Sequence, residues 1–246
     1  MQKSEAPKLR GAGAVHDAST RMPNTTKKRP FRIDVVLARI RSEVRRYRDA
    51  AMFELRDRGH GSLFEQLIAC ILSIRTRDEV SLPVALRLFE RVRTPAEICA
   101  LDLDSLISLI HGTSFAEAKA VQIAEIARRT VGEYGGELPA DPSVLMGFKG
   151  VGPKCAHLAL GVACGLPHIS VDVHVWRVVN RWGYVSAPTP EATMLALEDR
   201  LPQRYWIEIN RLLVPFGKHV CTGTLPKCST CPVLAYCRQV GVTEHR

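Results

Sequence analysis

Three features are scarce in this sequence of 246 residues: long apolar runs, strand-like alternation of apolar and polar residues, and acidic side chains. No run approaches the roughly 18 to 20 apolar residues that cross a bilayer. The N-terminus carries charge and proline where a secretory signal requires an apolar segment. We therefore expect an intracellular, cytoplasmic protein with no membrane partner.

The lack of alternation leaves helices as the expected elements. From about residue 33 onward, apolar residues recur at intervals of three and four, which predicts an all-α core. Ser62, Thr94 and Ser114 each stand three residues before a glutamate, a spacing typical of the capping box at a helix start. Asp141 and Thr189 each precede a proline, which also favours a helix start.

Residues 63–72 are apolar around most of a helix circumference, so we expect this helix inside a bundle. The cysteines outside the C-terminal region have apolar neighbours and are expected to pack in the core as small hydrophobic side chains. They are Cys70, Cys99, Cys155 and Cys164.

The scarcity of acidic residues gives the chain its charge. The sequence has 34 Lys plus Arg against 25 Asp plus Glu, a formal charge of +9, which points to a polyanionic partner such as nucleic acid. Residues 1–30 hold seven of the basic residues, two acidic ones and almost no large apolar side chains. We expect this segment to be a disordered basic tail, either an arm that contacts phosphates or a solvated extension.

Four cysteines lie within 17 residues near the C-terminus: Cys221, Cys228, Cys231 and Cys237. In a reducing compartment, such a cluster is more typical of a metal site than of disulfides. The segment has too little apolar content to form a core of its own, but four ligated thiolates would fold it. Zinc usually takes two close pairs of ligands, whereas this C-x6-C-x2-C-x5-C spacing favours a [4Fe-4S] cluster. Zinc and unligated thiols remain the alternatives.

Residues 145–159 read as a helix, a Gly150-Val151-Gly152 turn and a second helix that begins at Pro153. The glycines allow a tight turn with exposed amides, and the following helix N-terminus carries partial positive charge. Together they can bind a phosphate without side chains. This is the helix-hairpin-helix pattern of DNA binders that do not read sequence.

Lys154 falls in the first turn of that second helix, where the helix dipole is expected to lower the pKa of its amine. A lowered pKa suits a nucleophile, although a plain phosphate-binding lysine fits the spacing equally well. Asp172 reads as the N-cap of the next helix, and capping alone accounts for it. If it lies beside Lys154, it can instead stabilise a cationic sugar or transfer a proton. His174 either faces phosphate or pairs locally.

Three signals occur in order: the Gly150-to-Lys154 hairpin, the Val171-Asp172-Val173-His174 helix start and the cysteine loop. Over roughly residues 33–240 they resemble the endonuclease III family of helix-hairpin-helix base-excision DNA glycosylases. The resemblance implies an all-α, two-domain DNA glycosylase fold with a C-terminal iron-sulfur cluster loop. Its expected parts are a tail (1–30), a cluster domain (31–55 plus 167–246) and a six-helix domain that carries the hairpin (56–166).

By the same resemblance, Lys154 corresponds to the Schiff-base lysine and Asp172 to the catalytic aspartate. The implied activity is removal of oxidised pyrimidines from duplex DNA, followed by β-elimination at the abasic site. The implied partner is duplex DNA with a damaged base or an abasic site, bound by a monomer that holds a [4Fe-4S] cluster on its four C-terminal cysteines. Nucleoid association would follow from this role.

Two stretches depart from the family pattern where the family touches DNA. The usual L-S-A-Q-A-T-D appears as residues 72–78 with Arg75 in the glutamine position, and L-P-G appears as Phe148-Lys149-Gly150. Phe115 aligns approximately with an apolar wedge, and core packing suits it nearly as well. The expected DNA contacts are Arg75, Phe115, Lys149, Gly150, Val151, Gly152 and His174.

Two other functions are also compatible with these residues. One is a non-catalytic DNA-binding module whose cluster responds to redox state. The other is a monofunctional mismatch glycosylase, which removes a base and leaves the strand intact.

Overall fold

The structure, a computed structural model, describes residues 28–246, and all regular elements in this range are helical. The expectation of an all-α fold is confirmed, whereas the expected disorder of the basic tail lies almost entirely outside the described residues. None of the described helices is long and apolar enough to cross a membrane. In chain order, the elements are α1 (Ile33–Val44), α2 (Ala51–Asp57), α3 (Leu63–Ser73), α4 (Asp78–Phe89), α5 (Pro95–Cys99), α6 (Leu103–Leu109), α7 (Ala116–Tyr134), α8 (Pro142–Met146), α9 (Pro153–Cys164), α10 (Val173–Trp182), α11 (Pro190–Arg200), η1 (Gln203–Tyr205), α12 (Glu208–His219) and η2 (Cys228–Thr230).

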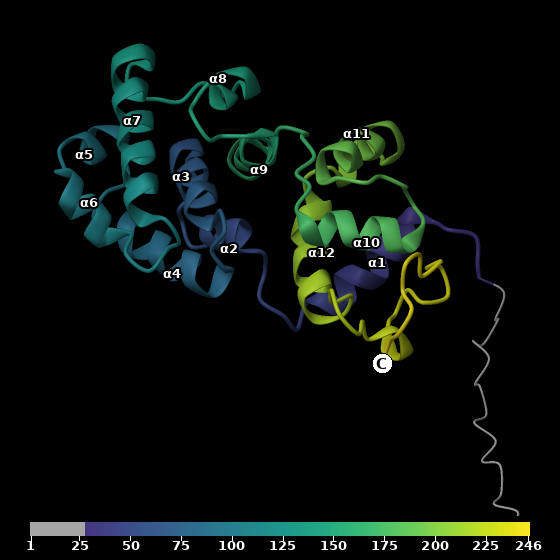
Figure 1. Cartoon of the computed structure of the whole chain (residues 1–246). Coiled ribbons are helices and arrows are strands. Elements are labelled where there is room, and N and C mark those ends of the chain that lie inside the picture. Colours follow the sequence, from purple (N-terminus) through teal and green to yellow (C-terminus); the bar gives the residue numbers. More distant parts are fainter. Residues whose placement is uncertain (1–27) are drawn as a thin grey trace, which may run out of the picture.

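The helices form two lobes, each with its own hydrophobic core (Figure 1). The first lobe contains α2 to α9. The second contains α1, α10 to α12 and the C-terminal cysteine loop, so the chain begins there, crosses to the first lobe and returns after α9. The boundaries inferred from the sequence stay a prediction. They assign residues 31–55 to the cluster domain, whereas Met52, Phe53 and Leu55 of α2 pack in the first core against α3, α4 and α9.

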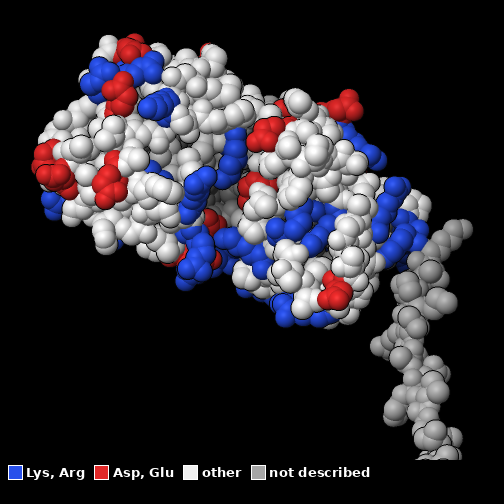
Figure 2. Space-filling view, viewed as in Figure 1, with Lys and Arg blue, Asp and Glu red and all other residues white. Residues whose placement is uncertain are grey.

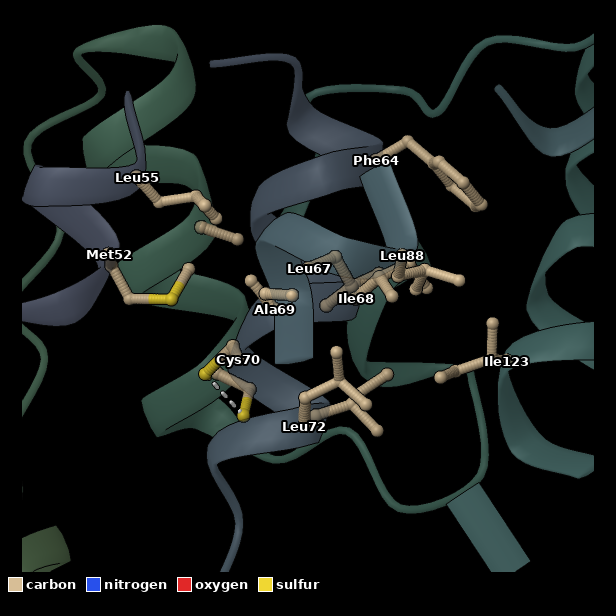
Figure 3. Packing of buried hydrophobic residues seen from close by; sticks show 14 of the residues in the cluster. Met52, Leu55, Phe64, Leu67, Ile68, Ala69, Cys70, Leu72, Leu88 and Ile123 are labelled. Carbon is tan, nitrogen blue, oxygen red and sulfur yellow. Dashed lines mark hydrogen bonds between the residues drawn. The ribbon is translucent and has the colours of Figure 1, made fainter. Parts of the chain in front are cut away.

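Helix α3 is the centre of the first lobe (Figure 3). Every residue from Phe64 to Leu72 is buried, as the apolar circumference of this segment predicts. Cys70 and Cys155 are buried too, with their sulfurs 2.7 Å apart. The expectation of core packing is wrong for Cys99 and Cys164, which are exposed, because each is the last residue of its helix where the chain turns outward.

Most of the expected helix caps form. Ser62 and Thr94 make complete capping boxes, and the side chains of Asp141 and Thr189 accept hydrogen bonds from first-turn amides. Ser114 does not cap a helix, so that prediction is wrong.

Helix α7 starts one residue later than the Ser114 pattern predicts. Phe115 takes the N-cap position with a left-handed backbone (φ 60°) and no side-chain cap. The Ser114 hydroxyl donates instead to the Arg75 carbonyl, 2.8 Å away. A contact with a distant loop has thus replaced the local cap.

Replacing Ser62 by alanine tests the contribution of the cap that begins α3. The Ser62 hydroxyl accepts from the Glu65 amide, and Glu65 accepts from the Ser62 amide in return. We expect Ser62→Ala to lower the free energy of unfolding by about 1 kcal/mol in urea titrations. The control is Ser108→Ala, an exposed serine inside α6, where alanine favours the helix and no loss is expected. Equal losses in both variants would refute the capping role.

Candidate active site

A cleft of about 780 Å³ runs between the two lobes. Figure 2 shows a hollow between the lobes, bordered on both sides by Lys and Arg side chains with a few acidic ones among them. The first lobe contributes the end of α3, the start of α4 and Lys154 of α9. The second contributes the starts of α10 and α11 and the end of α12. The structure brings three of the expected site residues into this one cleft: Lys154, Asp172 and His174.

Lys154 and Asp172 are held in place by the backbone. Lys154 is the second residue of α9, and its carbonyl accepts a hydrogen bond from the Ser170 hydroxyl at 3.1 Å. Asp172 is the N-cap of α10, as expected, and its Oδ1 accepts from the His174 and Val175 amides at 2.9 Å each. The first turn of α9 is therefore tied to the segment that leads into α10.

The electrostatics at Lys154 differ from the sequence expectation. Burial lowers the pKa of Lys154, but the neighbouring acidic groups of Cys70, Cys155, Asp172 and Asp78 outweigh it. The net pKa lies above the usual lysine value, so the predicted lowering is wrong. The helix-dipole prediction considers only α9 itself, whereas most of these acidic groups belong to α3, α4 and the start of α10. In the protein without DNA, Lys154 is an ammonium at neutral pH.

His174 and Arg177 pack tightly against α12. The His174 Nδ1 lies 3.0 Å from an Arg177 nitrogen, and the same nitrogen donates to the Gly217 carbonyl at 2.9 Å. Burial, Arg177 and Lys218 together lower the pKa of His174 despite the opposite effect of Asp172. The neutral ring accepts at Nδ1 from the arginine, which leaves its Nε2–H as the donor. A side chain at Gly217 would collide with His174, so this close approach requires glycine.

An ion pair crosses between the lobes inside the cleft. Lys218 of α12 lies 2.6 Å from Asp78 and 3.8 Å from Glu79 at the start of α4. The structure thus pairs Lys218 with carboxylates. Sequence reasoning assigned no role to Asp78. The position of Asp78 at a helix start can be predicted from the sequence, whereas its ion pair with Lys218, 140 residues further along the chain, cannot.

The hairpin before α9 has the expected tight turn. Gly150 adopts φ +81°, and an added Cβ would lie 2.8 Å from the Gln122 side-chain nitrogen, which itself donates to the Lys149 carbonyl at 2.6 Å. Val151 is buried, and its amide donates to the Phe148 carbonyl. Within the described chain, the Gly150 and Gly152 amides have no hydrogen-bond acceptor and remain available to an anion.

Arg75 and Phe115 lie together on two neighbouring loops. Arg75 has a left-handed backbone (φ 53°), and its guanidinium carbon is 5.8 Å from the centre of the Phe115 ring. Phe115 is 60% exposed, so it is not a core residue. Thr76 and Arg77, next along the chain, line the cleft. Arg75 is therefore adjacent in sequence to residues that line the cleft, but neither Arg75 nor Phe115 lines it.

The four C-terminal cysteines line one small cavity with Arg181, Trp182 and Phe216. Burial raises the pKa of Cys231 to about 12 and that of Cys237 to about 11, so without a cation these side chains stay protonated. No three His, Cys, Asp or Glu side chains of residues 28–246 are close enough to hold a single metal ion. The donor set is all sulfur, which suits an iron-sulfur cluster or zinc.

Contacts from outside the cysteine loop also hold it. Arg181 donates to the Thr222 and Gly223 carbonyls, and Arg39 donates to the Pro232 carbonyl. Lys28 donates to the Leu234 carbonyl, which attaches the beginning of the described chain to the loop. These contacts could not be predicted from the sequence, because their partners lie up to 206 residues apart.

Comparison with known proteins identifies the family. Residues 68–203 match the family described as HhH-GPD superfamily base excision DNA repair protein. Endonuclease III of Thermotoga maritima is 39% identical over 174 residues, which cover 71% of this chain and 82% of that protein.

Solved structures show the same likeness. A non-covalent endonuclease III–DNA complex and a trapped endonuclease III–DNA covalent intermediate match with TM-scores of 0.74 and 0.71, each at 30% identity over 84% of this chain and 94% of theirs. A thermostable thymine-DNA glycosylase matches with a TM-score of 0.71 over 84% of this chain and 95% of its own. At 22% identity, this last likeness shows the fold alone.

The hairpin offers a matched pair of glycine substitutions. Gly150→Ala forces a side chain into a left-handed backbone and displaces Gln122, so we expect a loss of about 1 kcal/mol or more in the free energy of unfolding. Gly152 has an ordinary φ of −99° and no atom within 4 Å of an added Cβ, so Gly152→Ala should cost little. Urea unfolding of both variants measures the difference. A Gly152→Ala variant as unstable as Gly150→Ala would contradict this geometry.

Proposed function

The chain belongs to the HhH-GPD superfamily of base excision DNA repair proteins, and we propose that it is a bifunctional DNA glycosylase and AP lyase. Its proposed substrate is duplex DNA that carries an oxidised pyrimidine or an abasic site, and it acts as a monomer. One observation carries the proposal: an amine and a carboxylate, Lys154 and Asp172, share one cleft directly behind a hairpin suited to phosphate.

The hairpin and nearby side chains are proposed to bind the DNA backbone. The free amides of Gly150 and Gly152 and the N-terminus of α9 favour an anion. Lys149 adds a charge on the hairpin, and the His174 Nε2–H is a donor inside the cleft. Because the Val151 amide is already bonded, Val151 contributes by anchoring the hairpin in the core.

Base removal is assigned to Asp172. An extruded nucleotide enters the cleft, and the bond from its sugar to the base breaks with positive charge growing on the sugar. A carboxylate oriented by two amides is suited to stabilise that charge without rearranging. The Lys154 amine then bonds to C1′ of the sugar.

Strand cleavage is assigned to the same amine. The adduct becomes an imine when the C1′–O4′ bond breaks, the sugar ring opens and O4′ takes up a proton. The imine acidifies the neighbouring C2′ proton, and transfer of that proton to a base expels the 3′ phosphate. Lys154 must first lose a proton, because the surrounding negative groups raise its pKa. Asp172, in the same cleft, is a base that can accept it.

The raised pKa of Lys154 favours a second candidate function, that of a monofunctional glycosylase. If Lys154 keeps its proton when DNA is bound, the enzyme removes the base and leaves the strand intact. A monofunctional glycosylase is therefore the alternative, and the two activities are separated by whether the strand breaks.

Cys221, Cys228, Cys231 and Cys237 are proposed to hold a [4Fe-4S] cluster. Support comes from their shared cavity and their all-sulfur donor set. When bound, the cluster supplies cross-links between thiolates that fold a loop with little core of its own. The role is structural, since no residue lines both the cysteine cavity and the cleft, although the end of α12 contributes neighbouring residues to each.

Borohydride reduction tests the amine chemistry. With abasic duplex, the wild-type protein should give a covalent complex, and Lys154→Ala should abolish it, because no other amine is assigned to the cleft chemistry. Lys149→Ala is the matched control: it weakens binding but leaves trapping intact at saturating DNA. Trapping that persists in Lys154→Ala would overturn the assignment of the nucleophile. Base release without trapping or strand cleavage in the wild type would favour the monofunctional alternative.

Metal analysis tests the cluster. The purified protein should contain iron and acid-labile sulfide at about four of each per chain. Cys237→Ser should lose most of both and expose residues 221–237 to limited proteolysis. Cys164→Ser, an exposed cysteine outside the loop, should retain both. Zinc at one per chain without sulfide would refute the cluster.

A further inference from the structure

A buried lysine that the proposed chemistry does not use lies beneath the Arg75 and Phe115 loops. Lys119, in the first turn of α7, is only 5% exposed. Its Nζ donates to the Leu72 carbonyl at 2.8 Å, the Ile74 carbonyl at 2.9 Å and the Thr76 hydroxyl at 3.1 Å. An ammonium has three donors, so these three acceptors satisfy it fully.

The setting of this charge is unusual. No carboxylate in residues 28–246 forms an ion pair with Lys119, and burying an unpaired charge is costly. Leu72 and Ile74 are at the C-terminal end of α3, where unpaired carbonyls carry partial negative charge. The lysine thus caps α3 from a different helix and holds the segment that follows it.

That segment is joined to a second loop through one hydroxyl. The Thr76 oxygen accepts from the Ser114 amide at 3.1 Å as well as from Lys119. The Ser114 hydroxyl donates back to the Arg75 carbonyl at 2.8 Å. Lys119, Thr76 and Ser114 therefore connect loop 74–77 to loop 113–115.

Both loops carry a strained residue at the tip. Arg75 and Phe115 are two of the four non-glycine residues with positive φ in the described chain. Such conformations persist only where surrounding contacts fix them, and they concentrate at functional sites. Here they bring an exposed guanidinium over an exposed aromatic ring. Aromatic rings and guanidinium planes are the surfaces on which unstacked bases stack.

We propose that Lys119 is a positioning residue for duplex recognition. It holds loops 74–77 and 113–115 as one unit, so that Arg75 and Phe115 present a preassembled stacking surface at the edge of the cleft. This role rests on the proposed DNA glycosylase function. Lys119 contacts neither Lys154 nor Asp172, and it acts through the two loop tips.

The ammonium form is required for all three contacts, which gives the role a pH signature. Burial lowers the pKa of Lys119 to about 8, and no charged group contributes to the shift. The groups that face Nζ, from α3 and from the loop into α4, are two carbonyls and a hydroxyl. Below about pH 8 the clamp is complete. As the pH rises through 8, the neutral amine loses one donor and its charge, and the loops loosen.

The test measures binding of a duplex that contains a tetrahydrofuran abasic analogue, which the enzyme cannot cleave. Fluorescence anisotropy gives Kd from below to well above pH 8 for the wild type and Lys119→Met. We expect Lys119→Met to bind about tenfold more weakly near neutral pH, as for loss of one stacked contact. Above pH 8 the wild-type affinity should fall towards that of Lys119→Met, whereas the affinity of Lys119→Met should not show this fall.

Two further variants keep the test decisive if Lys119→Met folds poorly. Thr76→Val removes the shared hydroxyl but keeps the lysine, and it should weaken duplex binding in the same direction. Thr130→Val, which removes a buried hydroxyl elsewhere on α7, is the matched control and should bind like the wild type. Borohydride trapping on single-stranded abasic DNA should be unchanged in Lys119→Met, because Lys119 is outside the cleft lining and Lys154 and Asp172 are untouched.

Each outcome bears on the proposal. Wild-type affinity and pH profile in both Lys119→Met and Thr76→Val would overturn the role of Lys119 while leaving the glycosylase function intact. If Lys119→Met lost single-strand trapping as strongly as duplex binding, Lys119 would only maintain the fold, and the proposed positioning role would be overturned. A wild-type protein that neither prefers abasic duplex nor forms a trapped complex would overturn the proposed function as well.

Discussion

The geometry of the cleft depends on the passage of the chain from α9 to α10. This short connection leaves one hydrophobic core and enters the other, and the Ser170 hydroxyl ties it to the carbonyl of Lys154. Two residues further on, Asp172 caps α10 with two amide hydrogen bonds. The backbones of Lys154 and Asp172 are therefore fixed at two helix N-termini, and the Asp172 carboxylate is oriented by two amides. A site built on helix starts in this way needs little rearrangement to meet a substrate.

The charge around Lys154 has a consequence for the order of events. Acidic groups around the cleft raise the pKa of the Lys154 amine, so the amine keeps its proton in the protein without DNA. Asp78, one of these groups, is also paired with Lys218, so this cleft lysine is already engaged by a carboxylate. Binding therefore depends on local donors: the hairpin amides, His174 and the basic residues that border the hollow in Figure 2. Net charge alone is a poor guide to this surface.

Local features of this structure were predictable from the sequence, and features that depend on tertiary contact were not. The Ser62 cap, the glycine turn and the Asp172 cap each depend on residues a few positions apart, and all form. Ser114 has the same local pattern as Ser62, yet the Arg75 carbonyl takes its hydroxyl. From the sequence, a lysine on an amphipathic helix, such as Lys119, is predicted to be exposed to solvent. In the structure the end of α3 covers it.

Lys154 is proposed as the amine that bonds to the sugar, and locating that bond in the protein tests the assignment. The wild-type protein is reduced with borohydride on an abasic oligonucleotide, digested, and examined by tandem mass spectrometry of the cross-linked peptide. We expect the residual sugar adduct to lie on the Lys154 side chain. An adduct on Lys149, Lys218 or the N-terminal amine, with Lys154 unmodified, would contradict it.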